Sequence, residues 1–228
     1  MNNKDISYLN IPITLNIIIV TSEIFTDIAR FYESGLSCLK YYTVLSNLFG
    51  TFTSFLSTYY LIQKYYHNTP IPNIITLLKF LSTSCLSLTF IIVIFVLSWS
   101  DKEKTLIQFL FCDTGLVFHT VGPVLSFISF IFWEVDYKLQ MDYIIYSIIA
   151  TGLYGFGIIF LVAKDMAFPP YPFLRVKNQT VLETAIWVIV ILSIHGLISF
   201  GLINLTNLIK DKYPQIMNIK EAKKEKIK

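Results

Sequence analysis

Charged residues are scarce in this sequence, and their scarcity excludes a soluble globular domain. Of 228 residues only 14% are charged, whereas 54% are hydrophobic and 16% are aromatic. Soluble domains carry about a quarter charged residues, so a chain with a mean hydropathy of +0.61 cannot face water on all sides. The formal net charge is only +3, which leaves no basic surface for a nucleic acid. We therefore expect a membrane protein whose main partner is the lipid bilayer.

Cysteine is also rare, and the three that occur exclude a disulfide framework. Cys38, Cys85 and Cys112 follow no metal-ligand spacing, and an odd number cannot all pair within the chain. We expect no metal and no cofactor. We expect no signal peptide, because residues 1–7 do not show its basic stretch and cleavage site. The first apolar segment is therefore predicted to remain as a spanning helix.

Long apolar stretches, in contrast, recur six times, each near the ~20 residues that a helix needs to cross the hydrocarbon core. Short polar breaks separate them, which favours antiparallel neighbours. We predict an all-α polytopic membrane protein with a single six-helix transmembrane domain over residues 1–209. A lysine-rich tail follows over 210–228, and it favours both termini in the cytosol. The predicted spans are about 9–29, 41–63, 73–98, 105–133, 143–163 and 181–209.

The fourth stretch is too long for one span, and residues 112–115 (Cys-Asp-Thr-Gly) interrupt it. A shallow segment up to Thr114, followed by a span from Leu116 to Trp133, suits the membrane better. His119 then lies about one turn below the non-cytosolic end of its span. Thr43 lies less than a turn below the same end of the second span, so the two polar side chains are predicted to share one depth.

Polar residues recur on one face of the second span, where Thr43, Asn47, Gly50 and Ser54 follow steps of four, three and four. Small and polar residues at such spacing also form packing seams between membrane helices. That interpretation stays open for Gly50 and Ser54. For Thr43 and Asn47 we favour a site, because His119 lies at their depth.

His119 precedes Pro123 by four residues, in the segment "FHTVGPVLSF". The proline removes the hydrogen bond from residue 123 back to the carbonyl of His119 and bends the helix. Backbone breaks inside membranes tend to line cavities. A hydrogen-bonded interior histidine is the alternative.

Two acids lie on one face of the first span, where Glu23 and Asp27 are four residues apart and Arg30 follows. They form either an interfacial ion cluster or a support that orients the histidine. His195, beside Gly196 in the last span, is predicted to serve helix packing. "GLYGFG" (152–157) lies within a predicted span, so we attribute it to close helix packing and not to a nucleotide loop.

The segments "KYYTVLSNL", "HTVGP" and "YPFLRV" together resemble the androgen-induced and androgen-dependent TFPI-regulating protein family and its microbial relatives. The resemblance covers roughly residues 10–208. It implies a six-span membrane hydrolase that cleaves fatty acid esters of hydroxy fatty acids with a threonine and a histidine. Those two residues match Thr43 and His119 here. Ser46 and Asn47 follow the threonine as they do in the microbial relatives.

These observations lead to two hypotheses from different classes. In the first, the chain is an intramembrane hydrolase of a fatty-acyl ester, with Thr43 as nucleophile and His119 as base. Asn47 would donate to the oxyanion. The catalytic residues would be held in position by Glu23, Asp27 and Ser46. In the second, it is a non-enzymatic multi-pass protein, either a small-solute transporter or a scaffold. The sequence does not indicate an oligomeric state.

The expected location follows from the source of the chain. In a eukaryote we expect the endoplasmic-reticulum membrane, because Lys224 and Lys226 in the final "KEKIK" have the spacing of a cytosolic dilysine retrieval signal. In a bacterium we expect the cell membrane.

Overall fold

A computed structural model describes residues 3–100 and 105–212, which form a bundle of helices with no β-strand among them. The long helices are α1 (Asn3–Ser34), α2 (Tyr42–His67), α3 (Asn73–Ile92), α6 (Gly122–Trp133), α7 (Tyr143–Ala163) and α8 (Val181–Lys212). The shorter ones are η1 (Gly35–Lys40), η2 (Val93–Leu97), α4 (Ser98–Ser100), α5 (Leu106–Phe111), η3 (Leu116–Val121), η4 (Pro172–Leu174) and η5 (Val176–Asn178). The predicted all-α class is confirmed.

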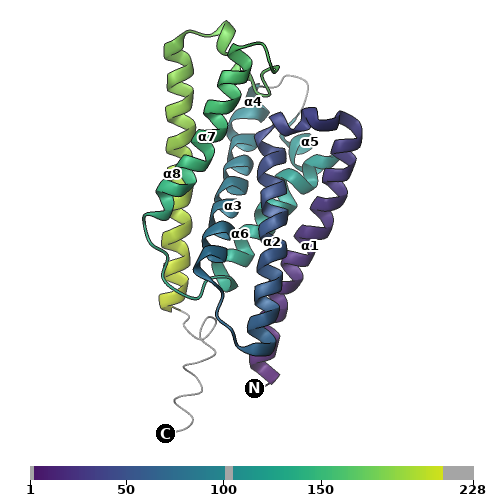
Figure 1. The fold of residues 1–228 in the computed structure, drawn as a ribbon, viewed down its shortest axis with the longest axis vertical. Helices are drawn as coiled ribbons and strands as arrows, with labels where there is room; N and C mark the ends of the chain where they lie inside the picture. Colours follow the sequence, from purple (N-terminus) through teal and green to yellow (C-terminus); the bar gives the residue numbers. More distant parts are fainter. Residues whose placement is uncertain (1–2, 101–104, 213–228) are drawn as a thin grey trace.

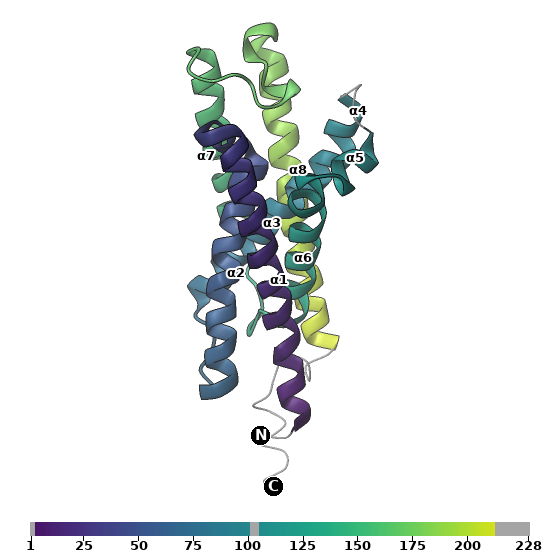
Figure 2. The ribbon, with the colours of Figure 1, turned by 90° about the vertical axis from the view of Figure 1, so that its right-hand side faces the viewer.

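The long helices run side by side (Figure 1). α1 packs against α2 and α6, α3 lies at the centre against α2, α6, α7 and α8, and α7 pairs with α8. Figure 2 shows the same bundle from the side of α1. The beginning of α1 and the end of α8 lie at the same end of the bundle (Figure 1). The tail beyond residue 212, on which the predicted orientation depends, lies outside the described residues.

Five helical segments in the described part of the chain are long and apolar enough to cross a membrane. They are Asn10–Lys40, Asn73–Leu97, Leu116–Trp133, Tyr143–Ala163 and Val181–Lys212. Large apolar side chains on the bundle surface are exposed, which suits contact with lipid, as for Phe25, Phe95 and Phe156. The chain is thus an all-α polytopic membrane protein.

The second predicted span, α2, differs from the other five. Its 26 residues are enough to cross a bilayer, but its many hydroxyl and amide side chains make it less apolar. These polar residues are buried against neighbouring helices: Thr43, Ser46, Asn47, Thr53, Ser54 and Ser57. Its aromatic residues Phe52 and Phe55 point outward and are exposed. The predicted polar face of α2 is therefore an interior face of the bundle.

The interrupted fourth stretch has the predicted form. The short helix α5 ends at Phe111, Asp113 adopts a positive φ of 51°, and a continuous helical segment then runs from Leu116 to Trp133. Its first part, η3, is a π-helix that contains His119, and Pro123 lies in the first turn of α6. Single π-turns within α-helices frequently occur at functional sites.

A buried polar network ties four helices together near the middle of the bundle. Lys79 of α3 donates to Asn16 Oδ1 of α1 (2.9 Å) and to Ser54 Oγ of α2 (2.7 Å). Asn16 Nδ2 in turn donates to Glu134 Oε1 (2.8 Å), just after α6, and to Ser129 Oγ (3.2 Å). Because Lys79 is only 1% exposed, it is an interior residue of the bundle.

Candidate active site

Two cavities meet at the non-terminal end of the bundle. The first, of about 210 Å³, is almost entirely apolar and lies among α3, α7, α8 and the loop that connects α7 to α8. The second, of about 760 Å³, is more polar, and its wall includes Arg30, Glu33, Asp113 and His119. Leu97, Thr43 and Tyr171 line both cavities. The boundary between an apolar and a polar space therefore passes through Thr43.

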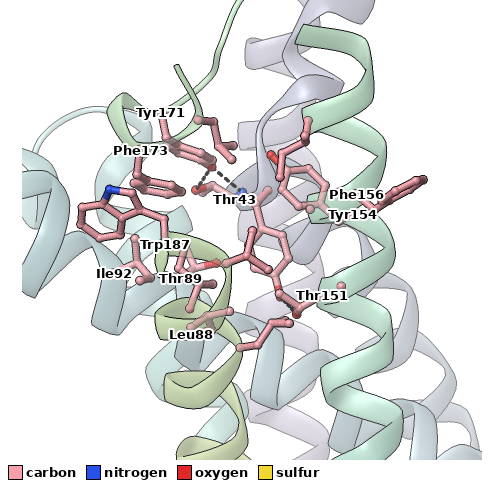
Figure 3. Close-up of a pocket in the computed structure, with 18 of the residues that line it drawn as sticks. Thr43, Leu88, Thr89, Ile92, Thr151, Tyr154, Phe156, Tyr171, Phe173 and Trp187 are labelled. Atoms are coloured by element: carbon pink, nitrogen blue, oxygen red, sulfur yellow. Dashed lines mark hydrogen bonds between the residues drawn. The ribbon is translucent and has the colours of Figure 1, made fainter. Parts of the chain in front are cut away.

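Thr43 is held at this boundary by Tyr171. As the second residue of α2, Thr43 has a backbone N–H without a partner inside the helix, and it donates to Tyr171 Oη at 3.2 Å. The two hydroxyl oxygens lie 3.3 Å apart. Figure 3 shows Thr43 beside Tyr171 and Phe173, with Ile92 and Trp187 on the same side of the apolar cavity.

Tyr171 is a site residue that the local sequence pattern did not reveal, although it lies within the segment "YPFLRV" on which the resemblance depends. It stacks on Phe173 with ring centroids 5.2 Å apart, and Phe173 packs against Trp187. Because the Tyr171 oxygen accepts the backbone N–H of Thr43, its own hydroxyl hydrogen stays available. Burial raises the pKa of Tyr171 above its ordinary value, so this hydroxyl keeps its proton.

His119 lines the polar cavity together with Thr43, as the shared depth predicted. No hydrogen bond joins the two side chains among the described residues, since Thr43 Oγ1 pairs with Tyr171. His119 Nδ1 has no hydrogen-bond partner in that part of the chain either. The orientation of His119 by Glu23 or Asp27 therefore stays a prediction.

Asn47 and Ser46 lie one turn deeper than the cavities. Asn47 Nδ2 donates to the carbonyls of Thr43 (2.8 Å) and Phe118 (3.2 Å), which ties α2 to η3. Ser46 Oγ donates to the carbonyl of Thr43 and lies 3.1 Å from Thr89 Oγ1 of α3. The oxyanion role of Asn47 stays a prediction, and both of its amide hydrogens are engaged in this structure. The Tyr171 hydroxyl, 3.3 Å from Thr43 Oγ1, is a further candidate donor.

Glu23 is buried beneath the same site. A Cβ atom built on Gly122 would come within 2.1 Å of Glu23 Oε1 and 3.1 Å of Asn47 Oδ1. The carboxyl group of Glu23 thus occupies the space that any larger residue at position 122 would need. Neither oxygen of Glu23 has a hydrogen-bond partner among the described residues, and Asp27 Oδ1 has none there either. Both acids face the protein interior, 1% and 5% exposed respectively.

The glycines of α7 correct the packing interpretation of "GLYGFG". A Cβ added at Gly152, Gly155 or Gly157 would meet no atom within 4 Å, so these residues do not permit a close approach of helices. Gly152 and Gly155 instead line the apolar cavity. Their missing side chains help to keep that space open.

His195 was predicted to serve helix packing, and it is fully buried between α3, α7 and α8. Both ring nitrogens are also within hydrogen-bond distance of a hydroxyl. Nδ1 lies 2.8 Å from Thr151 Oγ1, and Nε2 lies 3.1 Å from Ser84 Oγ. No local pattern indicates these partners, because they lie 44 and 111 residues away along the chain.

The fold defines the class of this protein, a multi-pass membrane protein. Its apolar cavity and its polar cavity meet at Thr43. Comparisons with protein-family models, curated proteins and solved structures found no match for this chain. Any assignment of function therefore depends on the chemistry of the site and on the resemblance described above.

Proposed function

We propose that this protein is an intramembrane lipid-ester hydrolase in which Thr43 is the nucleophile and His119 is the base. The observation that carries the proposal is the position of Thr43, which lines both the apolar cavity and the polar cavity that contains His119. A lipid ester needs both environments, one for its acyl chain and one for its polar carbonyl and water. The resemblance extends this proposal to fatty acid esters of hydroxy fatty acids.

The chemistry assigns one role to each group. The threonine hydroxyl is a weak nucleophile that needs a base, and neutral His119 would take its proton as Thr43 attacks the carbonyl carbon. His119 would then return the proton to the leaving alcohol. The Tyr171 hydroxyl would donate to the developing oxyanion. Water entering from the polar cavity would release the acid and regenerate Thr43.

Labelling with a fluorophosphonate probe, followed by peptide mapping, tests the nucleophile without requiring the natural substrate. We expect the label on the peptide that carries residue 43. Thr43→Ala should remove that label and lower the steady-state hydrolysis of a fatty-acyl ester at least about a thousandfold, whereas Thr43→Ser should retain both in part.

Thr51→Ala is the matched control, because Thr51 lies two turns further along α2, donates to the carbonyl of Asn47 within its own helix and lines neither cavity. It should behave as the wild type. A folded Thr43→Ala variant that hydrolyses the ester at the wild-type rate would reject the proposal.

We further propose the endoplasmic-reticulum membrane as the location if the source is a eukaryote. Lys224 and Lys226 support this proposal by their dilysine spacing, and both lie outside the described residues. Replacing both with serine should move the protein to later compartments of the secretory pathway in cells imaged with organelle markers. An unchanged distribution would reject the signal.

A further inference from the structure

A chain of buried hydrogen bonds crosses the bundle beside the apolar cavity. Tyr42 Oη of α2 lies 2.7 Å from Thr151 Oγ1 of α7, which lies 2.8 Å from His195 Nδ1 of α8. His195 Nε2 lies 3.1 Å from Ser84 Oγ of α3, and Ser84 Oγ donates to the carbonyl of Leu81 at 3.0 Å. Four helices each contribute one side chain to this chain.

One of the two tautomers of His195 gives this network the direction that a reaction needs. Ser84 Oγ lies within hydrogen-bond distance of both the Leu81 carbonyl and His195 Nε2, and it accepts from Nε2–H when its own hydrogen goes to Leu81. In that arrangement Nδ1 is the acceptor, the Thr151 hydroxyl donates to Nδ1, and the Tyr42 hydroxyl can donate to Thr151. This is the arrangement of a hydroxyl nucleophile and its base, with the base oriented by a third group.

Thr151 is buried, with 5% of its surface exposed, and it also borders the apolar cavity. Both Thr151 and Tyr42 line the apolar cavity, and Figure 3 shows Thr151 further along that cavity than Thr43. Gly155 follows Thr151 by four residues, on the same face of α7, and the space above Gly155 contains no atom within 4 Å. Thr151 is therefore part of the cavity wall, one helical turn from the open space beside Gly155.

We propose that Thr151 and His195 form a second nucleophile–base pair, which transfers acyl groups between lipid alcohols within the apolar cavity. Thr151 Oγ attacks the carbonyl carbon of a lipid ester while its proton passes to His195 Nδ1. The ester C–O bond breaks, and the departing alkoxide takes that proton to leave as an alcohol. A second lipid alcohol gives its proton to His195 and attacks the acyl-threonine, and Thr151 Oγ leaves with the proton regained.

The apolar surroundings of Thr151 favour an alcohol over water as the group that receives the acyl chain. The cavity wall beside Thr151 is made of apolar side chains such as Leu88, Ile92, Phe156 and Ile191, and His195 is fully buried. Water has little access to an acyl group at this position, whereas a lipid alcohol partitions into such a space. This inference depends on the proposed function for its substrate class, a lipid ester, and it does not depend on Thr43.

The test uses the Thr43→Ala protein, so that hydrolysis at the other site does not interfere. We expect the fluorophosphonate label on the peptide that carries residue 151. Incubation with an isotopically labelled fatty-acyl ester and an unlabelled hydroxy fatty acid should yield the exchanged ester, detected by mass spectrometry. Adding Thr151→Ala should remove label and exchange, Thr151→Ser should restore both, and His195→Gln should lower both at least about a hundredfold.

Thr83→Ala is the matched control, because Thr83 is a buried threonine that bonds across helices to Ser126 (2.9 Å) and lines neither cavity. Like Thr151→Ala, the Thr83→Ala variant loses an interhelical hydrogen bond. Unlike Thr151→Ala, it should keep both the fluorophosphonate label and the ester exchange.

The two proposals fail separately. The second pair would be overturned by a Thr43→Ala protein that keeps the wild-type thermal midpoint but shows neither label at residue 151 nor exchanged ester. In that case, label at residue 43 of the wild-type protein would still support the proposed hydrolase. Label at residue 151 alone would support the second pair and overturn the role of Thr43.

Discussion

Tyr171 connects two functions in a single residue. Its hydroxyl oxygen accepts the N–H of Thr43 in the first turn of α2 and lies 3.3 Å from Thr43 Oγ1. Tyr171 also lines both the apolar cavity and the polar one. A Tyr171→Phe substitution removes the hydroxyl and keeps the ring, so it distinguishes the contribution of the hydroxyl from that of the ring.

Tyr171→Phe is expected to lower the rate of ester hydrolysis about a hundredfold to a thousandfold, because it removes the proposed oxyanion donor, the hydroxyl 3.3 Å from Thr43 Oγ1. Loss of the bond to the Thr43 N–H should cost only about 0.5–2 kcal/mol, the usual value of a helix cap. Steady-state kinetics and a thermal melt of the same preparation measure the two effects. A wild-type rate with a lowered melting temperature would leave Tyr171 with the capping role alone.

Local sequence patterns predicted some of these residues and not others. Thr43 and His119, which line the polar cavity, were predicted to share one depth because polar residues at helical spacing and a proline four residues after a histidine are visible along the chain. The contacts of Tyr171 with Thr43 and of Thr151 with His195 were not predicted, because the partners come from distant segments. Hydroxyl groups are common in membrane helices, and only the packing of those helices decides which of them meet.

Helix α7 shows how an element shapes the site by what it lacks. Its glycines leave space on the cavity side, and Gly155 lies in the cavity wall with no atom within 4 Å of its missing Cβ. The sequence motif was correctly placed on a helix, but the predicted close packing was wrong. A glycine in a membrane helix can serve either a close contact or an open space, and the sequence alone does not distinguish them.

Gly155→Leu should fill part of the apolar cavity without disturbing the helix, since leucine has a higher helix propensity than glycine. We expect the turnover of long-chain esters to fall about tenfold or more, with short-chain esters hydrolysed at the wild-type rate. A chain-length series of nitrophenyl esters measures the change.

Gly201→Leu provides the control, because the position above Gly201 of α8 is equally open and lies in neither cavity. An equal loss across all chain lengths in Gly155→Leu alone would contradict an acyl-binding role for this cavity.

The bundle as a whole is held by polar groups as well as by apolar packing. Lys79, Asn16, Ser54 and Glu134 connect α1, α2, α3 and the end of α6 in the interior. Apolar packing alone does not drive helices together in lipid, so buried hydrogen bonds of this kind specify which helices are neighbours. Hydropathy predicted where the helices lie along the chain, although α1 (Asn3–Ser34) extends beyond its predicted span of about 9–29 at both ends. The contacts of this network join segments far apart in the chain, and hydropathy does not reveal them.

Lys79→Ala should strongly destabilise the protein, because it leaves Asn16 Oδ1 and the Glu134 charge without compensation. Breaking a buried charged network in this way costs about 3–5 kcal/mol. Lys79→Met combined with Glu134→Gln removes both charges and should recover much of the loss. Thermal unfolding in detergent, followed by tryptophan fluorescence, measures both.

Lys138→Ala is the comparison for Lys79→Ala, because Lys138 bonds to Asp211 at the surface (2.8 Å) with a side chain 66% exposed. Exposed pairs contribute about 0–1 kcal/mol, so its melting temperature should hardly change. Equal shifts for the two alanine variants would contradict the proposed role of the buried network.

The buried lysine also has a consequence for biogenesis. A lone α3 would carry Lys79 into hydrocarbon at about 2.5–3.5 kcal/mol, but the ribosome has already delivered α1 and α2 when α3 emerges. Asn16 and Ser54, whose oxygens accept from Lys79, precede it in the chain, whereas Glu134 follows it. We therefore expect α1, α2 and α3 to leave the insertion machinery together, because α3 meets the partners of its lysine as soon as it is made.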